Sequence, residues 1–178
     1  MTILISGGCK NGKSSLAQEA VLTLSRGGRH YYVATMLPGD AEDRARVARH
    51  VAARAGMGFE TLEQGRDILR CLEHADTDAV FLIDSVTALL ANEMFRDGGV
   101  DAEAPERVAR QLLELGGRVR DAVFVSDFLY SDAERFDPET ERYRRGLALV
   151  DRTLAERCDA VAELCAGRCT LHKGAWPV

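Results

Sequence analysis

The 178-residue sequence contains no apolar run that approaches the roughly 20 residues needed to cross a bilayer. Basic residues are not in excess, because 23 Lys and Arg stand against 28 Asp and Glu, for a formal net charge of −5. This balance argues against generic affinity for nucleic acids or anionic membranes. The apolar run at residues 2–5 is too short for a signal peptide and leads into a glycine-rich stretch, so we expect a cytoplasmic protein.

The sequence also lacks the signatures of disulfide and metal frameworks. Its five cysteines are odd in number and follow no framework spacing, which favours reduced thiols in a cytosolic protein. Cys165 and Cys169 precede His172, but this spacing is not usual for zinc, so we interpret both as packing thiols. Repeats, low-complexity tracts and linkers are absent as well. With 46% hydrophobic residues, residues 1–178 are expected to form a single domain with a sizeable core.

The most informative feature present is the run GGCKNGKS at residues 7–14. It matches the phosphate-loop pattern G-x-x-x-x-G-K-[ST] at every fixed position, with a strand pattern before it at 2–6 and a helix pattern after it at 15–22. A chance glycine turn, the alternative, would not require these flanking elements. Backbone N–H groups of such a loop point at phosphate oxygens, and the helix N-terminus adds partial positive charge. We therefore predict a nucleotide site in which Lys13 reaches the β- and γ-phosphates and Ser14 binds Mg²⁺. The predicted phosphate-binding residues are Gly7, Gly8, Cys9, Lys10, Asn11, Gly12, Lys13, Ser14 and Ser15.

Strand and helix patterns alternate along nearly the whole chain. Further strands are predicted at residues 31–35, 59–62, 79–83 and 122–125, and a terminal hairpin at 160–165 and 168–172. Helices are predicted at 40–54, 67–74, 86–95, 104–115 and 137–157, with Ile68, Leu69 and Leu72 on one side of the second. This order predicts a three-layer α/β fold of the P-loop NTPase type, with a mainly parallel sheet and helices on both faces. Ligands of such folds bind at the carboxyl ends of the strands.

Asp84 ends the continuous apolar run at 79–83. Phosphate-loop enzymes place an acid at this point, where it orients Mg²⁺ and its waters. The alternative is a carboxylate that merely ends a strand. The apolar run before it favours the metal site.

His50 shares one predicted helix face with Glu42, Arg46 and Arg54, because these residues recur every four positions. Val47 and Val51 are expected to form the narrow packing edge of this helix. Cations beside an imidazole favour its neutral form, which has a free nucleophilic nitrogen, and the same arginines would hold phosphate oxygens. On spacing alone, however, a solvated charged face is the commoner explanation.

In this order and spacing, the motifs resemble the bifunctional adenosylcobinamide kinase/adenosylcobinamide-phosphate guanylyltransferase family of cobalamin biosynthesis. The resemblance runs over nearly the whole chain. Residues 5–14 are similar to the family's strand and G-G-x-[RK]-[SN]-G-K-S loop, 32–36 to Y-I-A-T, 42–54 to R-[IV]-x-x-H-x-x-x-R, and 59–63 to W-x-T-x-E, with Phe59 in place of Trp. Asp84-Ser85-Val86-Thr87 with Asn92 is similar to D-C-L-T and its following asparagine, and Tyr143-Arg144 and Val150-Asp151 are weaker matches. Ser126-Asp127-Phe128-Leu129 stands where the family usually has N-E-V-G.

The resemblance implies two reactions. Adenosylcobinamide is phosphorylated with ATP or GTP, and GMP then passes from GTP to adenosylcobinamide phosphate through a guanylylated histidine, giving adenosylcobinamide-GDP. It identifies His50 as that histidine, Lys13 and Asp84 as further catalytic residues, and Ser14 with Asp84 as the Mg²⁺ ligands. Asp127 is a candidate base for the acceptor hydroxyl, and the family suggests a homotrimer. The guanine nucleotide is also expected to contact Ala34, Thr35, Met36, Arg46, Val51, Arg54 and Glu63.

Two other functions are compatible with the phosphate loop. One is a small-molecule kinase that never transfers a guanylyl group. The other is a nucleotide-dependent switch or assembly module, although the N-K-x-D guanine signature of switch GTPases is absent from the sequence.

Overall fold

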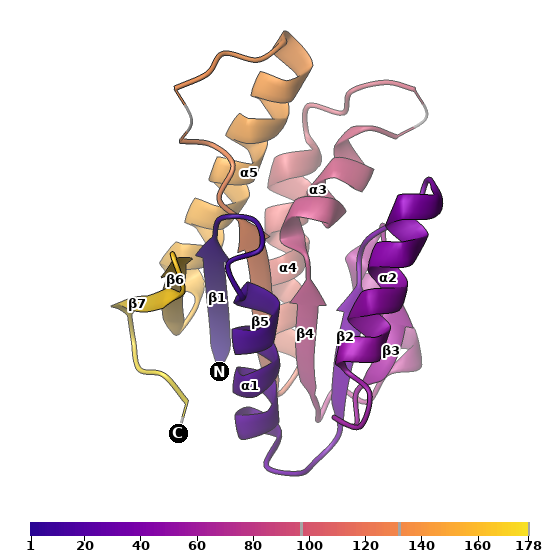
Figure 1. Cartoon of the computed structure of the whole chain (residues 1–178), viewed down its shortest axis with the longest axis vertical. Coiled ribbons are helices and arrows are strands. Elements are labelled where there is room, and N and C mark those ends of the chain that lie inside the picture. Colours follow the sequence, from indigo (N-terminus) through magenta and orange to yellow (C-terminus); the bar gives the residue numbers. More distant parts are fainter. Residues whose placement is uncertain (97, 132, 178) are drawn as a thin grey trace.

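The computed structural model describes residues 1–96, 98–131 and 133–177, apart from the side chains of residues 43, 46 and 53. Within this part of the chain, seven strands form one sheet in the order β3-β2-β4-β5-β1-β6-β7 (Figure 1). All neighbouring strands are parallel except β6 and β7, which form an antiparallel terminal hairpin. The strands are β1 (Thr2–Gly7), β2 (His30–Ala34), β3 (Glu60–Glu63), β4 (Val80–Asp84), β5 (Asp121–Asp127), β6 (Ala160–Cys165) and β7 (Arg168–Lys173).

Helices cover both faces of the sheet, so the three-layer fold predicted from the sequence is confirmed. Helices α1 (Lys13–Ser25) and α2 (Ala41–Ala53) lie on one face (Figure 1). The other face carries α3 (Val86–Met94), α4 (Ala104–Arg118), α5 (Pro138–Arg157) and a short 3₁₀ helix, η1 (Ile68–His74). At the start of α5, the Asp137 carboxylate accepts hydrogen bonds from the N–H groups of Glu139 and Thr140, which is the cap expected before a Pro at the first helical position.

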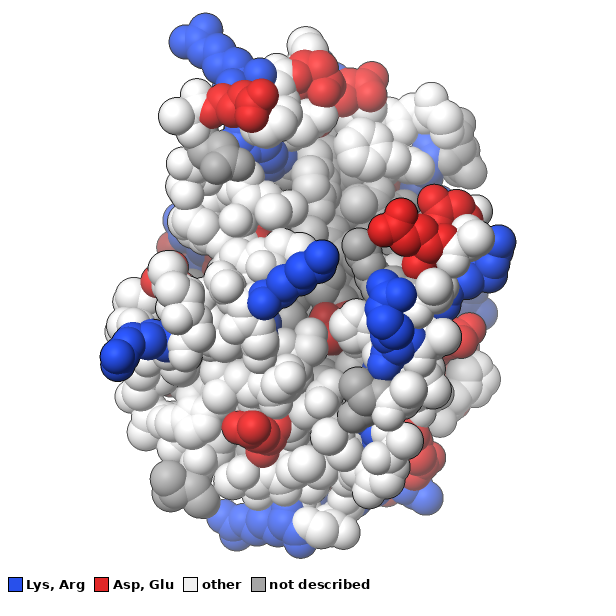
Figure 2. Space-filling model, in the orientation of Figure 1, with Lys and Arg blue, Asp and Glu red and all other residues white. Residues whose placement is uncertain are grey.

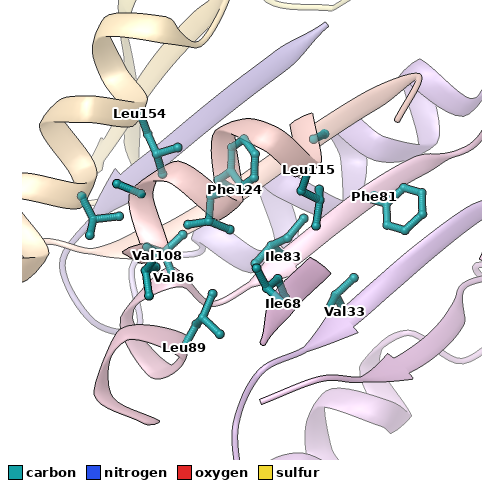
Figure 3. Packing of buried hydrophobic residues seen from close by; sticks show 14 of the residues in the cluster. Val33, Ile68, Phe81, Ile83, Val86, Leu89, Val108, Leu115, Phe124 and Leu154 are labelled. Atoms are coloured by element: carbon teal, nitrogen blue, oxygen red, sulfur yellow. The ribbon is translucent and has the colours of Figure 1, made fainter. Parts of the chain in front are cut away.

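The core has two parts because successive strand residues point to opposite faces of the sheet. Ile3, Ile5 and Leu82 pack toward α1 in one cluster. Val33, Phe81, Ile83 and Phe124 pack toward Val86, Leu89, Leu115 and Leu154 on the other face (Figure 3). The rigid double-sided core holds the carboxyl ends of β1, β4 and β5 in register, which positions the residues that follow each strand.

The segment at 67–74 differs from the expected α-helix. It is a 3₁₀ helix whose buried residues are Ile68 and Cys71, whereas Leu69 and Leu72 are only partly buried. A 3₁₀ helix has three residues per turn, so residues three apart share a face. This period replaces the predicted Ile68, Leu69 and Leu72 face.

The cysteines at the end of the chain also differ from expectation. Cys165 and Cys169 are exposed on the hairpin, and the buried thiols are Cys71 and Cys158. Among the described residues, no three His, Cys, Asp or Glu side chains group as metal ligands. Across the same residues, no helix combines the length and apolar character that a membrane span requires.

Candidate active site

The phosphate loop joins β1 to α1, and its backbone path requires glycine at two positions. Gly7 has φ of 153°, and a Cβ atom there would collide with the carbonyl oxygen of Leu164 on the neighbouring strand β6. Gly12 has φ of 89° and is the N-cap of α1. Side-chain-bearing residues rarely adopt such positive φ values. The loop therefore brings the N-terminus of α1, with its unpaired N–H groups, to the carboxyl end of the sheet.

Lys13 is buried at the first turn of α1. Its ammonium group donates to the carbonyl oxygen of Gly8 at 2.6 Å and lies 2.8 Å from Oδ1 of Asp127. Asp127 ends β5, and its backbone N–H donates to the hydroxyl of Thr87 at 2.8 Å. A cation and a carboxylate from two neighbouring strand ends thus meet beside the loop.

Asp84 ends β4 and lies beside Tyr32 of β2. The Tyr32 hydroxyl donates to Oδ2 of Asp84 at 2.9 Å. Burial raises the pKa of Tyr32 well above its usual range, and the charge of Asp84 raises it further, so the hydroxyl remains a donor. This contact orients the carboxylate. Asp84 shares the lining of one cleft with Ser14, and a carboxylate with a hydroxyl suits Mg²⁺, which takes few protein ligands beside phosphate oxygens and waters.

A cleft of about 320 Å³ lies between the phosphate loop and α2. Its volume is in the range of small-molecule sites. Figure 2 shows a hollow in the face drawn, with Lys and Arg side chains on both sides and an acidic group recessed between them. The cleft is lined by Cys9, Lys10, Asn11, Gly12, Lys13, Ser14, Ser15, Met36, Arg49, His50, Asp84, Ser85, Val125 and Asp127. Most of the residues predicted to bind nucleotide therefore lie together, although they come from separate parts of the sequence.

His50 is half-buried on α2 and faces the cleft, as the resemblance implies. Arg54, four residues later, is arranged differently from the accessible cation that the spacing predicts. It is only 6% exposed, and its guanidinium lies over the Tyr32 ring, 3.4 Å from the centroid. Arg54 also donates to the carbonyl oxygen of His50 at 3.0 Å and to the Thr61 hydroxyl at 3.4 Å. A stacked and hydrogen-bonded guanidinium of this kind fixes the end of α2 rather than holding phosphate.

Other predicted nucleotide contacts are arranged less simply. Val51 is 53% exposed, so it does not form the expected packing edge of α2. Glu63 is exposed at the end of β3. The Thr35 side chain is fully buried and bonded to the backbone of Ser85, with its hydroxyl accepting from Ser85 N–H at 2.7 Å. The side chain of Arg46 lies outside the described part of the structure.

Arg49 is the cation that the sequence reasoning missed. It is exposed and lines the cleft with His50. Its position next to His50 in a run of arginines gave no sign of which one would turn toward the cleft, because that depends on how α2 is rotated against the sheet. The arrangement supplies cations from both the loop and α2 around one anion-sized space.

Comparison with known proteins assigns the chain. Residues 3–171 match the sequence model of the family described as CobU, cobinamide kinase / cobinamide phosphate guanyltransferase. The chain belongs to this family. It is 31% identical over 170 residues to the bifunctional adenosylcobalamin biosynthesis protein CobP of Pseudomonas aeruginosa, and the match covers 94% of each protein. It is therefore an enzyme with the two transferase activities of cobinamide kinase and cobinamide phosphate guanyltransferase.

Solved structures that resemble the chain support the fold. The RadB recombinase superposes with a TM-score of 0.52 at 20% identity, covering 99% of this chain and 82% of that one. A separate ATPase domain superposes with a TM-score of 0.53 at 9% identity, covering 91% and 68%. At these identities the likeness shows the fold alone. The specific activity rests on the CobU family match.

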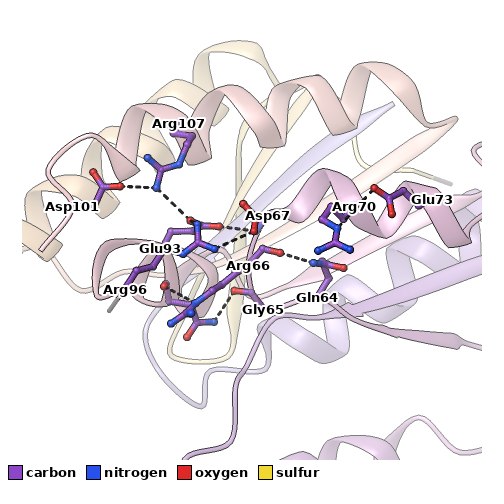
Figure 4. A network of polar contacts seen from close by, with 11 residues as sticks. Gln64, Gly65, Arg66, Asp67, Arg70, Glu73, Glu93, Arg96, Asp101 and Arg107 are labelled. Carbon is purple, nitrogen blue, oxygen red and sulfur yellow. Dashed lines mark hydrogen bonds and ion pairs between the residues drawn. The ribbon is translucent and has the colours of Figure 1, made fainter. Parts of the chain in front are cut away.

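In this CobU-family chain, polar contacts on α3 hold the loops that follow β2 and β3. The Asn92 side chain donates to the carbonyl oxygens of Thr35 and Gly65, at 2.8 and 2.9 Å. The neighbouring Glu93 is fully buried and accepts from the N–H of Asp67 at 2.6 Å. Figure 4 shows Glu93 also paired with Arg96 and Arg107, each at 3.3 Å. The network fixes the rim of the cleft beside Met36.

Replacing Glu93 by Ala is expected to destabilise the protein by roughly 3 kcal/mol or more, because it leaves two guanidiniums beside a buried, unpaired N–H. For a chain of this size, that corresponds to a fall in Tm of about 6–12 °C. Glu114→Ala is the matched control, since Glu114 pairs with Arg118 on the exposed side of α4 and should change stability by less than about 1 kcal/mol. Thermal unfolding measures both. Equal Tm values for the two variants would contradict a structural role for Glu93.

Asp151 is a second buried carboxyl near the phosphate loop. It lies on α5 and accepts from the Tyr130 hydroxyl at 3.1 Å. Burial raises its pKa to about 7, to which the nearby charge of Asp127 also contributes. Below that pH, Asp151 is mainly neutral and adds little repulsion to phosphate groups at the loop.

A larger groove of about 510 Å³ lies at the opposite end of the sheet. It is lined mainly by apolar or small side chains from the ends of α4 and α5, including Leu112, Gly116 and Cys158. Ligands of parallel α/β sheets bind at the carboxyl ends of the strands, and this groove is at the amino ends. The cleft beside the phosphate loop is therefore the better candidate active site.

Proposed function

We propose that this enzyme phosphorylates adenosylcobinamide and then transfers GMP from GTP to the product through a covalent intermediate on His50, giving adenosylcobinamide-GDP. The observation that carries the proposal is that His50 on α2 and the phosphate loop before α1 line the same cleft. A plain phosphate-loop kinase has no need of a histidine at this place.

The kinase half-reaction uses the loop and the strand ends. Loop N–H groups and Lys13 hold the triphosphate of ATP or GTP, so that catalysis comes mainly from positioning and charge neutralisation. The Lys13 ammonium, which contacts Asp127 before nucleotide binds, turns to the phosphates. This exchange frees the Asp127 carboxylate to take the proton from the aminopropanol hydroxyl as its oxygen bonds to the γ-phosphorus.

The residues that would hold Mg²⁺ are Ser14 and Asp84, which share the cleft. When bound, the ion neutralises charge on the phosphate oxygens. The Tyr32 hydroxyl holds the Asp84 carboxylate in one orientation. Positioning of this kind lowers the reorganisation that binding requires.

Guanylyl transfer proceeds in two displacements at the α-phosphorus of GTP. A neutral ring nitrogen of His50 forms the P–N bond while the bond to the β-phosphate oxygen breaks, and pyrophosphate leaves. A phosphate oxygen of adenosylcobinamide phosphate then bonds to the same phosphorus, and the imidazole leaves with a proton. The intermediate divides one difficult transfer into two easier ones. Arg49 is placed to hold phosphate oxygens, and Ala34, Met36 and Ser85 line the space beside His50.

We further propose that the chain forms one nucleotide-binding domain and assembles as a cytoplasmic homotrimer, both by family resemblance. The mass of the pure protein in sedimentation tests the oligomeric state. A monomer would contradict it.

Mass spectrometry tests the central proposal. After incubation with GTP and Mg²⁺ and without a corrinoid, the protein is expected to gain the mass of one guanylyl group, located on the peptide that contains His50. ATP in place of GTP is the control for nucleotide choice. A protein that phosphorylates cobinamide but gains no guanylyl group would instead be a plain kinase.

A further inference from the structure

Exposed phenylalanines gather at the carboxyl end of the sheet. Three of the six phenylalanines, Phe95, Phe128 and Phe136, are exposed, although this side chain is usually buried. Phe128 and Phe136 lie in the connection between β5 and α5, and Phe95 follows α3. Figure 1 places the end of α3 and the start of α5 beyond the strand ends, on the side of the phosphate loop. Gathered apolar side chains on a surface indicate a binding site.

Phe128 stands directly beside the phosphate loop. It follows Asp127, whose carboxylate lies 2.8 Å from the Lys13 ammonium. Its own N–H donates to the carbonyl oxygen of Gly7 at 2.9 Å. A molecule lying on the Phe128 ring therefore has the phosphoryl-transfer groups as its nearest neighbours.

The two rings in the β5–α5 connection are held by partners. Phe128 packs edge-on against Tyr130, with centroids 4.7 Å apart. The buried guanidinium of Arg144 lies 4.8 Å from the Phe136 centroid. Arg144 also donates to the carbonyl oxygen of Leu129 at 2.9 Å, which ties the Phe136 end of the connection to its Phe128 end. A surface that is already ordered binds its ligand at a smaller entropic cost.

We propose that Phe128 and Phe136 form an acceptor surface on which the corrin ring of cobinamide lies while its hydroxyl arm extends into the cleft. The inference rests on the proposed function and names the residues that select the acceptor. Cobinamide is a broad macrocycle whose reacting hydroxyl stands at the end of a side chain, so it needs a platform beside the phosphate site. In Figure 2, the surface above the hollow, over the β5–α5 connection, is largely free of charged side chains.

The test compares wild type with Phe128→Ala, Phe136→Ala and the double variant in cobinamide phosphorylation. The KM for cobinamide is expected to rise about tenfold in each single variant, the effect of losing one aromatic contact. The KM for ATP should stay at the wild-type value, because the phosphate loop supplies the nucleotide contacts. Leu171→Ala is the matched control: Leu171 is 41% exposed, against 39% for Phe128 and 40% for Phe136, but lies on β7 at the sheet edge.

Equilibrium dialysis with cobinamide alone separates binding from chemistry. The double variant is expected to bind cobinamide more weakly, yet to form the GMP adduct from GTP as wild type does. Unchanged cobinamide binding and KM would overturn the acceptor surface. The same result together with a smaller mass in light scattering would assign both rings to a contact between subunits, which also overturns it. A wild-type protein that forms no adduct contradicts the proposed function, whereas dialysis still decides the acceptor surface.

Discussion

His50→Ala is expected to abolish covalent labelling by α-labelled GTP and to slow GMP transfer to cobinamide phosphate by a factor on the order of 10⁴ or more, because the variant has no nucleophile in the cleft to replace the imidazole. Phosphorylation of cobinamide by ATP should remain close to wild type, since Lys13 and the phosphate loop carry that step. Denaturing electrophoresis measures the label. Its loss on brief acid treatment identifies a P–N bond, because the protonated imidazole leaves readily.

A second histidine variant controls for nonspecific labelling. His172 is exposed on β7, where its ring lies 2.8 Å from Glu163, and His172→Ala should label fully. Label retained in His50→Ala would place the guanylyl group on another residue. Loss of both activities in His50→Ala would point to a disturbed fold, which the Tm of the variant reveals.

The sequence predicts those parts of the site that depend on local backbone chemistry. The phosphate loop is recognisable because Gly7 and Gly12 occupy positions that a side chain would obstruct or strain. Asp84 follows a strand buried on both faces, and such a strand is apolar throughout. The Asp137 cap likewise depends on hydrogen bonds within one turn. In each case the cause lies within a few residues of the effect.

Contacts between distant segments could not be predicted in the same way. The spacing of charges on α2 predicts a solvated face, but Arg54 is buried because Tyr32 presents its ring at that place. Arg49 lines the cleft instead, which depends on how the helix is rotated against the sheet. The pairing of Glu93 with Arg107 joins α3 to α4. Such pairs are set by tertiary packing, which a periodic pattern does not encode.

Family resemblance supplies what neither periodicity nor spacing can. From the sequence pattern, His50 is a residue on a charged helix, and from the structure it is a half-buried ring facing a cleft. The CobU family match connects that ring with guanylyl transfer. The structure adds that the ring and Lys13 line one cleft, so the two half-reactions use overlapping space and one nucleotide must leave before the other reaction begins.

Lys13→Ala is expected to lower the rate of cobinamide phosphorylation by a factor on the order of 10²–10³, the effect of removing one positioned cationic donor from a developing charge. Lys10→Ala is the comparison in the same loop, since the Lys10 side chain is exposed, and a much smaller loss is expected. Steady-state kinetics with saturating ATP measure both variants.

The Lys13 contact with Asp127 makes the prediction sharper. Removing the ammonium leaves the half-buried Asp127 carboxylate without its cation at 2.8 Å, so Lys13→Ala should bind nucleotide more weakly through added repulsion as well as lost attraction. Lys13→Ala combined with Asp127→Asn removes that repulsion and should recover part of the nucleotide affinity but not the phosphoryl transfer. Full phosphoryl transfer by Lys13→Ala would place the transfer site away from the phosphate loop.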